Sequence, residues 1–105
     1  MRTQRNIRVH LLLACLAVAL GIALRISSVE FALVFIAIML VFGMEMVNTV
    51  VEVCVDLITD EYHPLARAAK DVAAGAVLLN AMLAVIIALF VFVPHLWRLA
   101  APFLR

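Results

Sequence analysis

Three long apolar runs constrain what this chain can fold into more than any other feature of its sequence. They cover residues 11–24, 31–44 and 72–93. A helix needs about 20 residues to cross the hydrocarbon core of a bilayer, so the third run is long enough alone. The first two become long enough when their helices extend into flanking residues. The runs predict an all-α membrane protein with three transmembrane helices, over residues 7–26, 29–58 and 65–94, in one domain of residues 1–105.

The composition supports this class of protein. The chain has 105 residues, of which 69% are hydrophobic and only 14% are charged. A soluble domain of this size buries too little of its surface to hide so many apolar side chains. The net charge of +1 gives no indication of nucleic-acid binding. Cys15 and Cys54 each lie inside an apolar stretch and are interpreted as packing residues.

The basic residues outside the runs predict how the helices are oriented. Three spans place the N-terminus, interpreted as the start of a retained first helix, on the same side as residues 59–71. That side carries five of the eight basic residues, and the other side carries three. Because loops rich in Lys and Arg stay in the cytoplasm, the N-terminus is predicted to be cytoplasmic. Pro64 is expected in the first turn of the third helix, and Pro94 is expected to end that span.

Four polar side chains follow one another along the second apolar run and its continuation. Glu45, Asn48, Glu52 and Asp56 fall within about 80° of one another on a helix with about 100° per residue, which predicts a polar stripe. Carboxylates at membrane depth normally face a bundle interior or a water-filled cavity and mark function. Hydrogen bonding between helices is the alternative explanation, and it suits Asn48 better than the carboxylates.

Further charged residues, Arg67, Lys70 and Asp71, lie at the predicted start of the third helix. Two carboxylates can hold Mg²⁺, a lysine can neutralise phosphate oxygens, and another carboxylate can take a proton from a hydroxyl group. These are the parts that phosphoryl transfer needs. The three glycines, at positions 21, 43 and 75, form no nucleotide-binding glycine loop. The alternative is a small oligomeric membrane protein whose carboxylates line a cation or proton path.

The three histidines receive only general assignments from the residues alone. His10 and His95 lie at the ends of spans, where placement at the membrane interface is the default. His63 lies in the acidic loop beside Tyr62, where contact with a ligand and simple helix capping are about equally expected.

Residues 45–79, EMVNTVVEVCVDLITDEYHPLARAAKDVAAGAVLL, resemble the prokaryotic diacylglycerol kinase family, and within it most closely the undecaprenol kinase branch. The stretch RNIRVHLLLA, residues 5–14, is similar to the sequence before the first span in that family. The resemblance implies a homotrimeric lipid kinase of the bacterial inner membrane. It also implies transfer of the γ-phosphate of ATP to a membrane lipid alcohol, undecaprenol or diacylglycerol. Mg²⁺ would be the cofactor, and the sites would lie between subunits on the cytoplasmic side.

Positions that match the family motif take their expected roles from the resemblance. Glu45 is expected to be the catalytic base and to contact the lipid, and Asn48 is expected to orient Glu45. Glu52 would bind metal and ATP, with Asp56 in support. Further contacts to ATP are expected from Glu61, Tyr62, His63, Lys70 and Asp71. Further contacts to the lipid are expected from Asn6, Arg8 and His10.

The chain departs from the family pattern near its N-terminus. Family members usually carry an amphipathic surface helix before this region, whereas four residues precede Arg5 here. A glutamate that helps to bind metal normally precedes the Arg5–Asn6 pair, whereas this chain has Gln4. An amide binds Mg²⁺ more weakly than a carboxylate does. The departures indicate a start farther upstream, a truncated fragment or a weakened kinase, and Gln4 is not explained by the first two.

Overall fold

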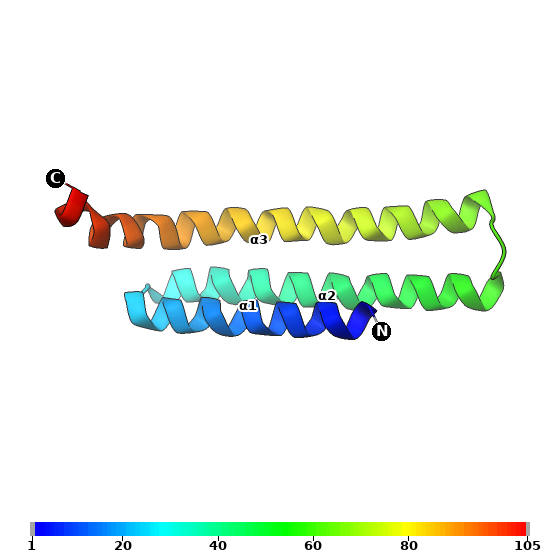
Figure 1. The fold of residues 1–105 in the computed structure, drawn as a ribbon, viewed down its shortest axis with the longest axis horizontal. Coiled ribbons are helices and arrows are strands. Elements are labelled where there is room, and N and C mark those ends of the chain that lie inside the picture. The colour runs from blue at the N-terminus through cyan, green and yellow to red at the C-terminus, as the bar shows by residue number, and fades with distance from the viewer. Residues whose placement is uncertain (1, 105) are drawn as a thin grey trace.

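The computed structural model describes the backbone of residues 2–104 and the side chains of residues 7–104. This part of the chain forms three helices, α1 (Arg2–Leu24), α2 (Ser28–Ile58) and α3 (Pro64–Leu104). They form an elongated antiparallel bundle of 60 × 22 × 21 Å (Figure 1). Each helix is long and apolar enough to cross a membrane. The prediction of an all-α membrane protein with three transmembrane helices is confirmed.

The three helices differ in length, and this shapes one end of the bundle. α2 and α3 lie side by side over most of the length of α2, and α1 lies against the first part of α2 (Figure 1). The N-terminal end of α1 lies partway along α2. The end of α2, the start of α3 and the loop between them therefore project beyond α1.

α1 ends because Arg25 adopts a left-handed backbone conformation, with φ of 56°. The amide of Ile26 donates to the carbonyl of Gly21 over 3.1 Å, and the amide of Arg25 donates to the carbonyl of Ile22 over 3.2 Å. This is the Schellman pattern of a helix C-terminus. A Cβ atom at Gly21 would lie only 2.9 Å from Cδ1 of Ile26, so a larger residue there would force the Ile26 side chain to shift. The helix thus ends at Leu24 rather than at residue 26.

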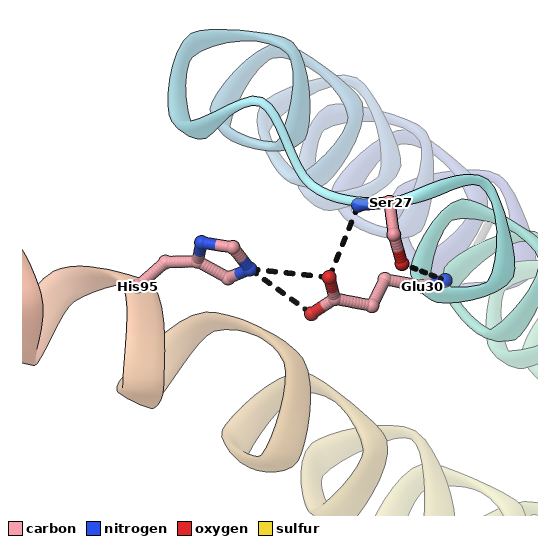
Figure 2. Close-up of polar contacts among 3 residues, drawn as sticks. All are labelled: Ser27, Glu30 and His95. Carbon is pink, nitrogen blue, oxygen red and sulfur yellow. Dashed lines mark hydrogen bonds and ion pairs between the residues drawn. The ribbon is translucent and has the colours of Figure 1, made fainter.

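α2 begins with a capping box formed by Ser27 and Glu30 (Figure 2). The Ser27 hydroxyl accepts a hydrogen bond from the Glu30 amide over 3.1 Å, and the Glu30 carboxylate accepts one from the Ser27 amide over 3.0 Å. The same carboxylate lies 3.1 and 3.2 Å from Nε2 of His95 on α3. One side chain therefore caps α2 and joins it to α3.

The buried apolar cluster of the described residues is small and lies near the α1–α2 turn. It consists of Ile26, Val34, Val91 and Phe92. Large apolar side chains are exposed along all three helices. An apolar surface of this extent marks contact with a membrane or a partner rather than with water. The outer faces of the bundle are therefore suited to lipid or to another subunit.

α3 begins at Pro64, as predicted, but it continues past Pro94 to Leu104. Pro94 was expected to end the third span, and the helix does not end there. Proline removes one backbone N–H and the hydrogen bond that it would make within the helix. Membrane helices tolerate this loss because neighbouring groups satisfy the freed carbonyl. His95, directly after Pro94, holds this part of α3 against α2 through Glu30.

Candidate active site

The α2–α3 loop and the helix ends beside it enclose a polar hollow of about 420 Å³, here termed the loop hollow. Its polar lining comes from both helices and from the loop: Asp56, Thr59, Asp60, Glu61, Tyr62, His63, Arg67, Lys70 and Asp71. Apart from Glu52, every residue expected to contact ATP belongs to this set. The hairpin thus brings together residues that the sequence could group only by motif.

Lys70 and Asp56 form an ion pair beside the loop hollow. Lys70 Nζ donates to Asp56 Oδ1 over 2.8 Å, and the carboxylate of Glu52, one turn earlier on α2, also attracts this ammonium group. The side chains are 39% and 61% exposed, so a ligand in the hollow can reach both. Arg67 Nε lies 3.8 Å from Asp71 Oδ2 within α3. The lining of the hollow therefore includes two cationic side chains, Lys70 and Arg67, each next to a carboxylate.

Short-range hydrogen bonds hold the loop of residues 59–63. The amide of Glu61 donates to Thr59 Oγ1 over 3.1 Å, and the amide of Leu65 donates to His63 Nδ1 over 3.1 Å. His63 therefore caps the start of α3. In the neutral ring this leaves the proton on Nε2, which is then a donor. Contact between this nitrogen and a ligand stays a prediction.

Glu45 lies apart from the loop hollow, in a second cluster with His10. At 5% exposure it is the one buried charged side chain among the described residues. His10 Nε2 on α1 lies 3.8 Å from Glu45 Oε2, and the His10 ring meets the Phe42 ring edge-on with centroids 6.1 Å apart. Asp56 lies about 16 Å farther along α2, at about 1.5 Å per residue. One chain therefore does not bring Glu45 to the loop hollow.

The predicted polar stripe on α2 is divided between different environments. Glu45 is buried, Glu52 is exposed, and Asp56 is bonded to Lys70. The Asn48 Oδ1 atom is buried without a hydrogen-bond partner among the described residues. A buried acceptor left unpaired costs about 1–3 kcal/mol, which marks Asn48 as a candidate for contact with a substrate or a second subunit. The division also removes the continuous row of carboxylates that a cation or proton path would need.

An apolar groove of about 360 Å³ lies among the three helices, next to the cluster of Glu45 and His10. Among the side chains of residues 7–104, His10 is the one polar group that lines it. Alanines on α1 and α3, among them Ala14, Ala17 and Ala84, leave the groove open because their side chains are short. The groove is therefore wide enough for an alkyl chain and has a polar group at one end.

The residues expected on the lipid side are described only in part. His10 lies at the apolar groove, and Arg8 is exposed. Asn6 and Gln4 lie within α1, but their side chains fall outside the described residues. The expected effect of Gln4 on metal binding stays a prediction for the same reason.

The carboxylates near the loop hollow suit Mg²⁺ without forming a closed metal site. Across the side chains of residues 7–104, no three His, Cys, Asp or Glu groups lie close enough together to hold a metal ion. Mg²⁺ in proteins often binds through one or two carboxylates, together with waters and substrate phosphates. Glu52, an exposed carboxylate beside Lys70 and Asp56, fits that requirement.

The family profile of prokaryotic diacylglycerol kinase matches residues 1–92. The chain belongs to this family. It is 45% identical over 95 residues to undecaprenol kinase of Bacillus subtilis, an alignment that covers 90% of this chain and 77% of the relative. Membership makes the chain a lipid kinase, so the predicted family and the predicted class of enzyme are confirmed. The roles of individual residues stay predictions.

Two diacylglycerol kinases are more distant relatives. The chain is 39% identical over 98 residues to that of Synechocystis, covering 92% of this chain and 56% of the relative. It is 38% identical over 71 residues to that of Escherichia coli K12, covering 68% of this chain and 58% of the relative. The chain thus spans little more than half the length of these two proteins. No solved structure matches it.

Sequence reasoning missed two contacts that the structure contains. One is the approach of His10 to Glu45, and the other joins His95 to Glu30. The spacing of Ser27 and Glu30 is the signature of a capping box, so it could have located Glu30 at a helix start. No sequence signal connects Glu30 to His95, because the two residues are 65 positions apart.

Proposed function

We propose that this lipid kinase transfers the γ-phosphate of ATP to the hydroxyl group of a membrane lipid alcohol, with undecaprenol favoured over diacylglycerol. The observation that carries the proposal is the position of Glu45, a buried carboxylate beside the polar end of an apolar groove. The groove suits the hydrocarbon chain of a lipid, and Glu45 suits the hydroxyl group at its end. The preference for undecaprenol rests on the higher identity to the undecaprenol kinase.

Glu45 acts as the general base in this proposal. Its carboxylate takes the proton from the lipid hydroxyl group while the lipid oxygen forms a bond to the γ-phosphorus. The bond between that phosphorus and the bridging oxygen of ADP breaks in the same transfer. His10, 3.8 Å away, holds the carboxylate between α1 and α2. Burial keeps bulk water from the base, which disfavours transfer of the phosphoryl group to water.

The loop hollow binds the nucleotide. The Lys70 ammonium group moves from Asp56 to the phosphate oxygens, because a charge-assisted hydrogen bond to phosphate is a strong one. The further contacts expected to ATP come from Glu61, Tyr62, His63 and Asp71, which line the same hollow. Glu52 would hold Mg²⁺, and the bound ion would neutralise phosphate charge.

The separation of the two clusters supports a homotrimer with sites between subunits. Within one chain, Glu45 lies about 16 Å along α2 from Asp56, whereas a general base must come within about 3 Å of the reacting hydroxyl group. A loop hollow supplied by a second subunit closes this gap. The unpaired oxygen of Asn48 and the exposed alanines at the start of α3, such as Ala69 and Ala74, suit the close approach of another helix.

We place the loop hollow at the cytoplasmic face of the bacterial inner membrane. The N-terminal end of α1 points toward the end of the bundle that carries the α2–α3 loop (Figure 1). Five of the eight basic residues lie in the N-terminal end of α1 and in residues 59–71, which comprise the loop and the first turns of α3, and basic segments remain on the cytoplasmic side. ATP is available on that side.

The test measures transfer of labelled γ-phosphate by the purified full chain in detergent, with Mg²⁺ and either undecaprenol or diacylglycerol. Faster labelling of undecaprenol supports the proposal. Labelling of diacylglycerol alone overturns the assigned acceptor, and labelling of neither lipid by intact oligomers overturns the reaction. Native mass spectrometry of the same sample checks the trimer, because an active monomer would contradict shared sites.

A further inference from the structure

The end of the bundle opposite the loop hollow carries a second charged hollow, of about 310 Å³. Its lining comes from the end of α1, from the turn after it and from α3: Ala23, Leu24, Arg25, His95, Arg98 and Leu99. We term it the arginine hollow. The reaction proposed above uses none of these residues.

The carboxylate nearest to the arginine hollow is already engaged. Glu30 is the one acidic residue of the sequence outside residues 45–71. Figure 2 shows its carboxylate between the Ser27 amide and the His95 ring. Among the described residues, neither Arg25 nor Arg98 forms an ion pair. Two guanidinium groups therefore border one hollow without a carboxylate partner.

Arg25 occupies a position that disfavours arginine in two independent ways. Its φ of 56° is left-handed, and the corresponding position of a Schellman motif is usually glycine because a Cβ atom is strained there. In the orientation proposed above, it also lies on the side of the membrane where Lys and Arg are the less common residues. The backbone of the turn therefore does not account for an arginine at this position.

The contact between Glu30 and His95 holds together the two backbone segments that carry the arginines. His95 lies on α3, three residues before Arg98. Glu30 lies in the first turn of α2, just after the turn that carries Arg25. The hollow is therefore part of a braced end of the bundle rather than a gap between loose segments.

We propose that the arginine hollow binds the phosphate group of an anionic membrane phospholipid, on the bilayer face opposite the kinase site. Guanidinium groups match phosphate well, since each can donate two parallel hydrogen bonds. The side chains of Leu24 and Leu99 line the hollow next to the arginines. These apolar walls suit the first carbons of an acyl chain, which favours a lipid headgroup over free phosphate.

The experiment measures binding of phosphatidylglycerol to the purified full chain in neutral detergent by native mass spectrometry. Phosphatidylcholine with the same acyl chains is the reference lipid. Arg25→Gly and Arg98→Gln are each expected to weaken phosphatidylglycerol binding about fivefold, the attraction of one basic residue for an anionic surface. Arg67→Gln is the matched control, because it removes an exposed guanidinium group at the other end.

Arg25→Gly keeps the test interpretable because glycine suits the left-handed backbone at this position. The variant is expected to fold at least as well as the parent chain while it loses lipid preference. Unchanged phosphatidylglycerol binding by the Arg25→Gly/Arg98→Gln double variant overturns the proposal. Displacement of the bound lipid by an equal concentration of inorganic phosphate overturns the assignment to lipid. Neither result depends on the kinase reaction, because the readout is binding.

Discussion

Lys70 on α3 donates a hydrogen bond of 2.8 Å to Asp56 on α2, across the base of the α2–α3 loop. Both side chains are partly exposed, and exposed ion pairs contribute only about 0–1 kcal/mol to stability. The pair therefore matters less for folding than for where it holds the Lys70 ammonium group. That group faces the hollow in which the residues expected to contact ATP come together.

Lys70→Gln is expected to raise KM for ATP about tenfold or more, because a hydrogen bond to a charged group contributes about 1.5–3 kcal/mol. Steady-state kinetics at saturating lipid measure this change. The thermal stability of the variant should stay within about 1 kcal/mol of the parent. An unchanged KM would remove Lys70 from the nucleotide site. The reverse pattern, lower stability with normal kinetics, would make the pair purely structural.

Glu45→Gln is expected to lower kcat by about 10²–10⁴-fold, the usual contribution of a general base. The amide keeps the shape of the side chain but cannot take the proton. Replacing a buried charge by a neutral group should leave the melting temperature unchanged or higher. Phosphoryl-transfer assays and thermal unfolding in detergent are measured on the same preparation. Full activity would show that Glu45 is not the base.

Asn48→Leu is expected to lower kcat about tenfold or more without lowering the stability of the subunit. Its buried Oδ1 atom has no partner among the described residues, so replacement by an apolar side chain removes an unpaired acceptor. Native mass spectrometry separates two reasons for lost activity. A trimer with low activity places the amide at the reacting groups, and dissociation places it between subunits. Full activity in an intact trimer contradicts both.

Glu52→Gln is expected to raise the Mg²⁺ concentration needed for half-maximal activity about tenfold or more, because an amide replaces the proposed carboxylate ligand. A magnesium titration at fixed ATP measures this change. Asp60→Asn is the matched control, since it removes another carboxylate of the same region that has no assigned ligand. If both variants respond alike, the effect reflects the general charge of the hollow and not a ligand at Glu52.

Gly21→Ala is expected to destabilise the chain by about 1–3 kcal/mol, the usual range for overpacking. The new methyl group would lie 2.9 Å from Cδ1 of Ile26 and 3.0 Å from Cε1 of Phe31. Gly43→Ala is the control, because nothing lies within 4 Å of a methyl group at that position. The control should be neutral or stabilising by up to about 1 kcal/mol, from the higher helix propensity of alanine. Thermal unfolding in detergent compares the two variants.

The sequence predicted the three helices well because the forces that form them are local. The length of the apolar runs predicts helices that cross a bilayer, and the polar stretches between them predict the connecting turns. Pro64 predicts the start of the third helix. It misjudged Pro94, because a missing N–H does not end a helix when the surrounding contacts hold the backbone. Those contacts, such as the bond from His95 to Glu30, come from distant positions in the chain.

The candidate site could be predicted in its residues but not in its arrangement. Spacing on one helix face grouped Glu45 with Asp56, although burial separates them and about 16 Å of helix lies between them. The partner of Asp56 comes from α3 and the partner of Glu45 comes from α1. Only the register of antiparallel helices decides these pairs, and periodicity within one helix carries no information about that register.

α3 is the longest helix, and its 41 residues extend for about 60 Å at about 1.5 Å per residue. The oily layer of a bilayer is only about 30 Å thick. α3 is therefore about twice as long as this layer is thick, and its length leaves room for the α2–α3 hairpin outside the acyl chains. In the proposed reaction, a nucleotide would then dock at the hairpin without parting the acyl chains, and it would meet the lipid hydroxyl group only where the phosphoryl group is transferred.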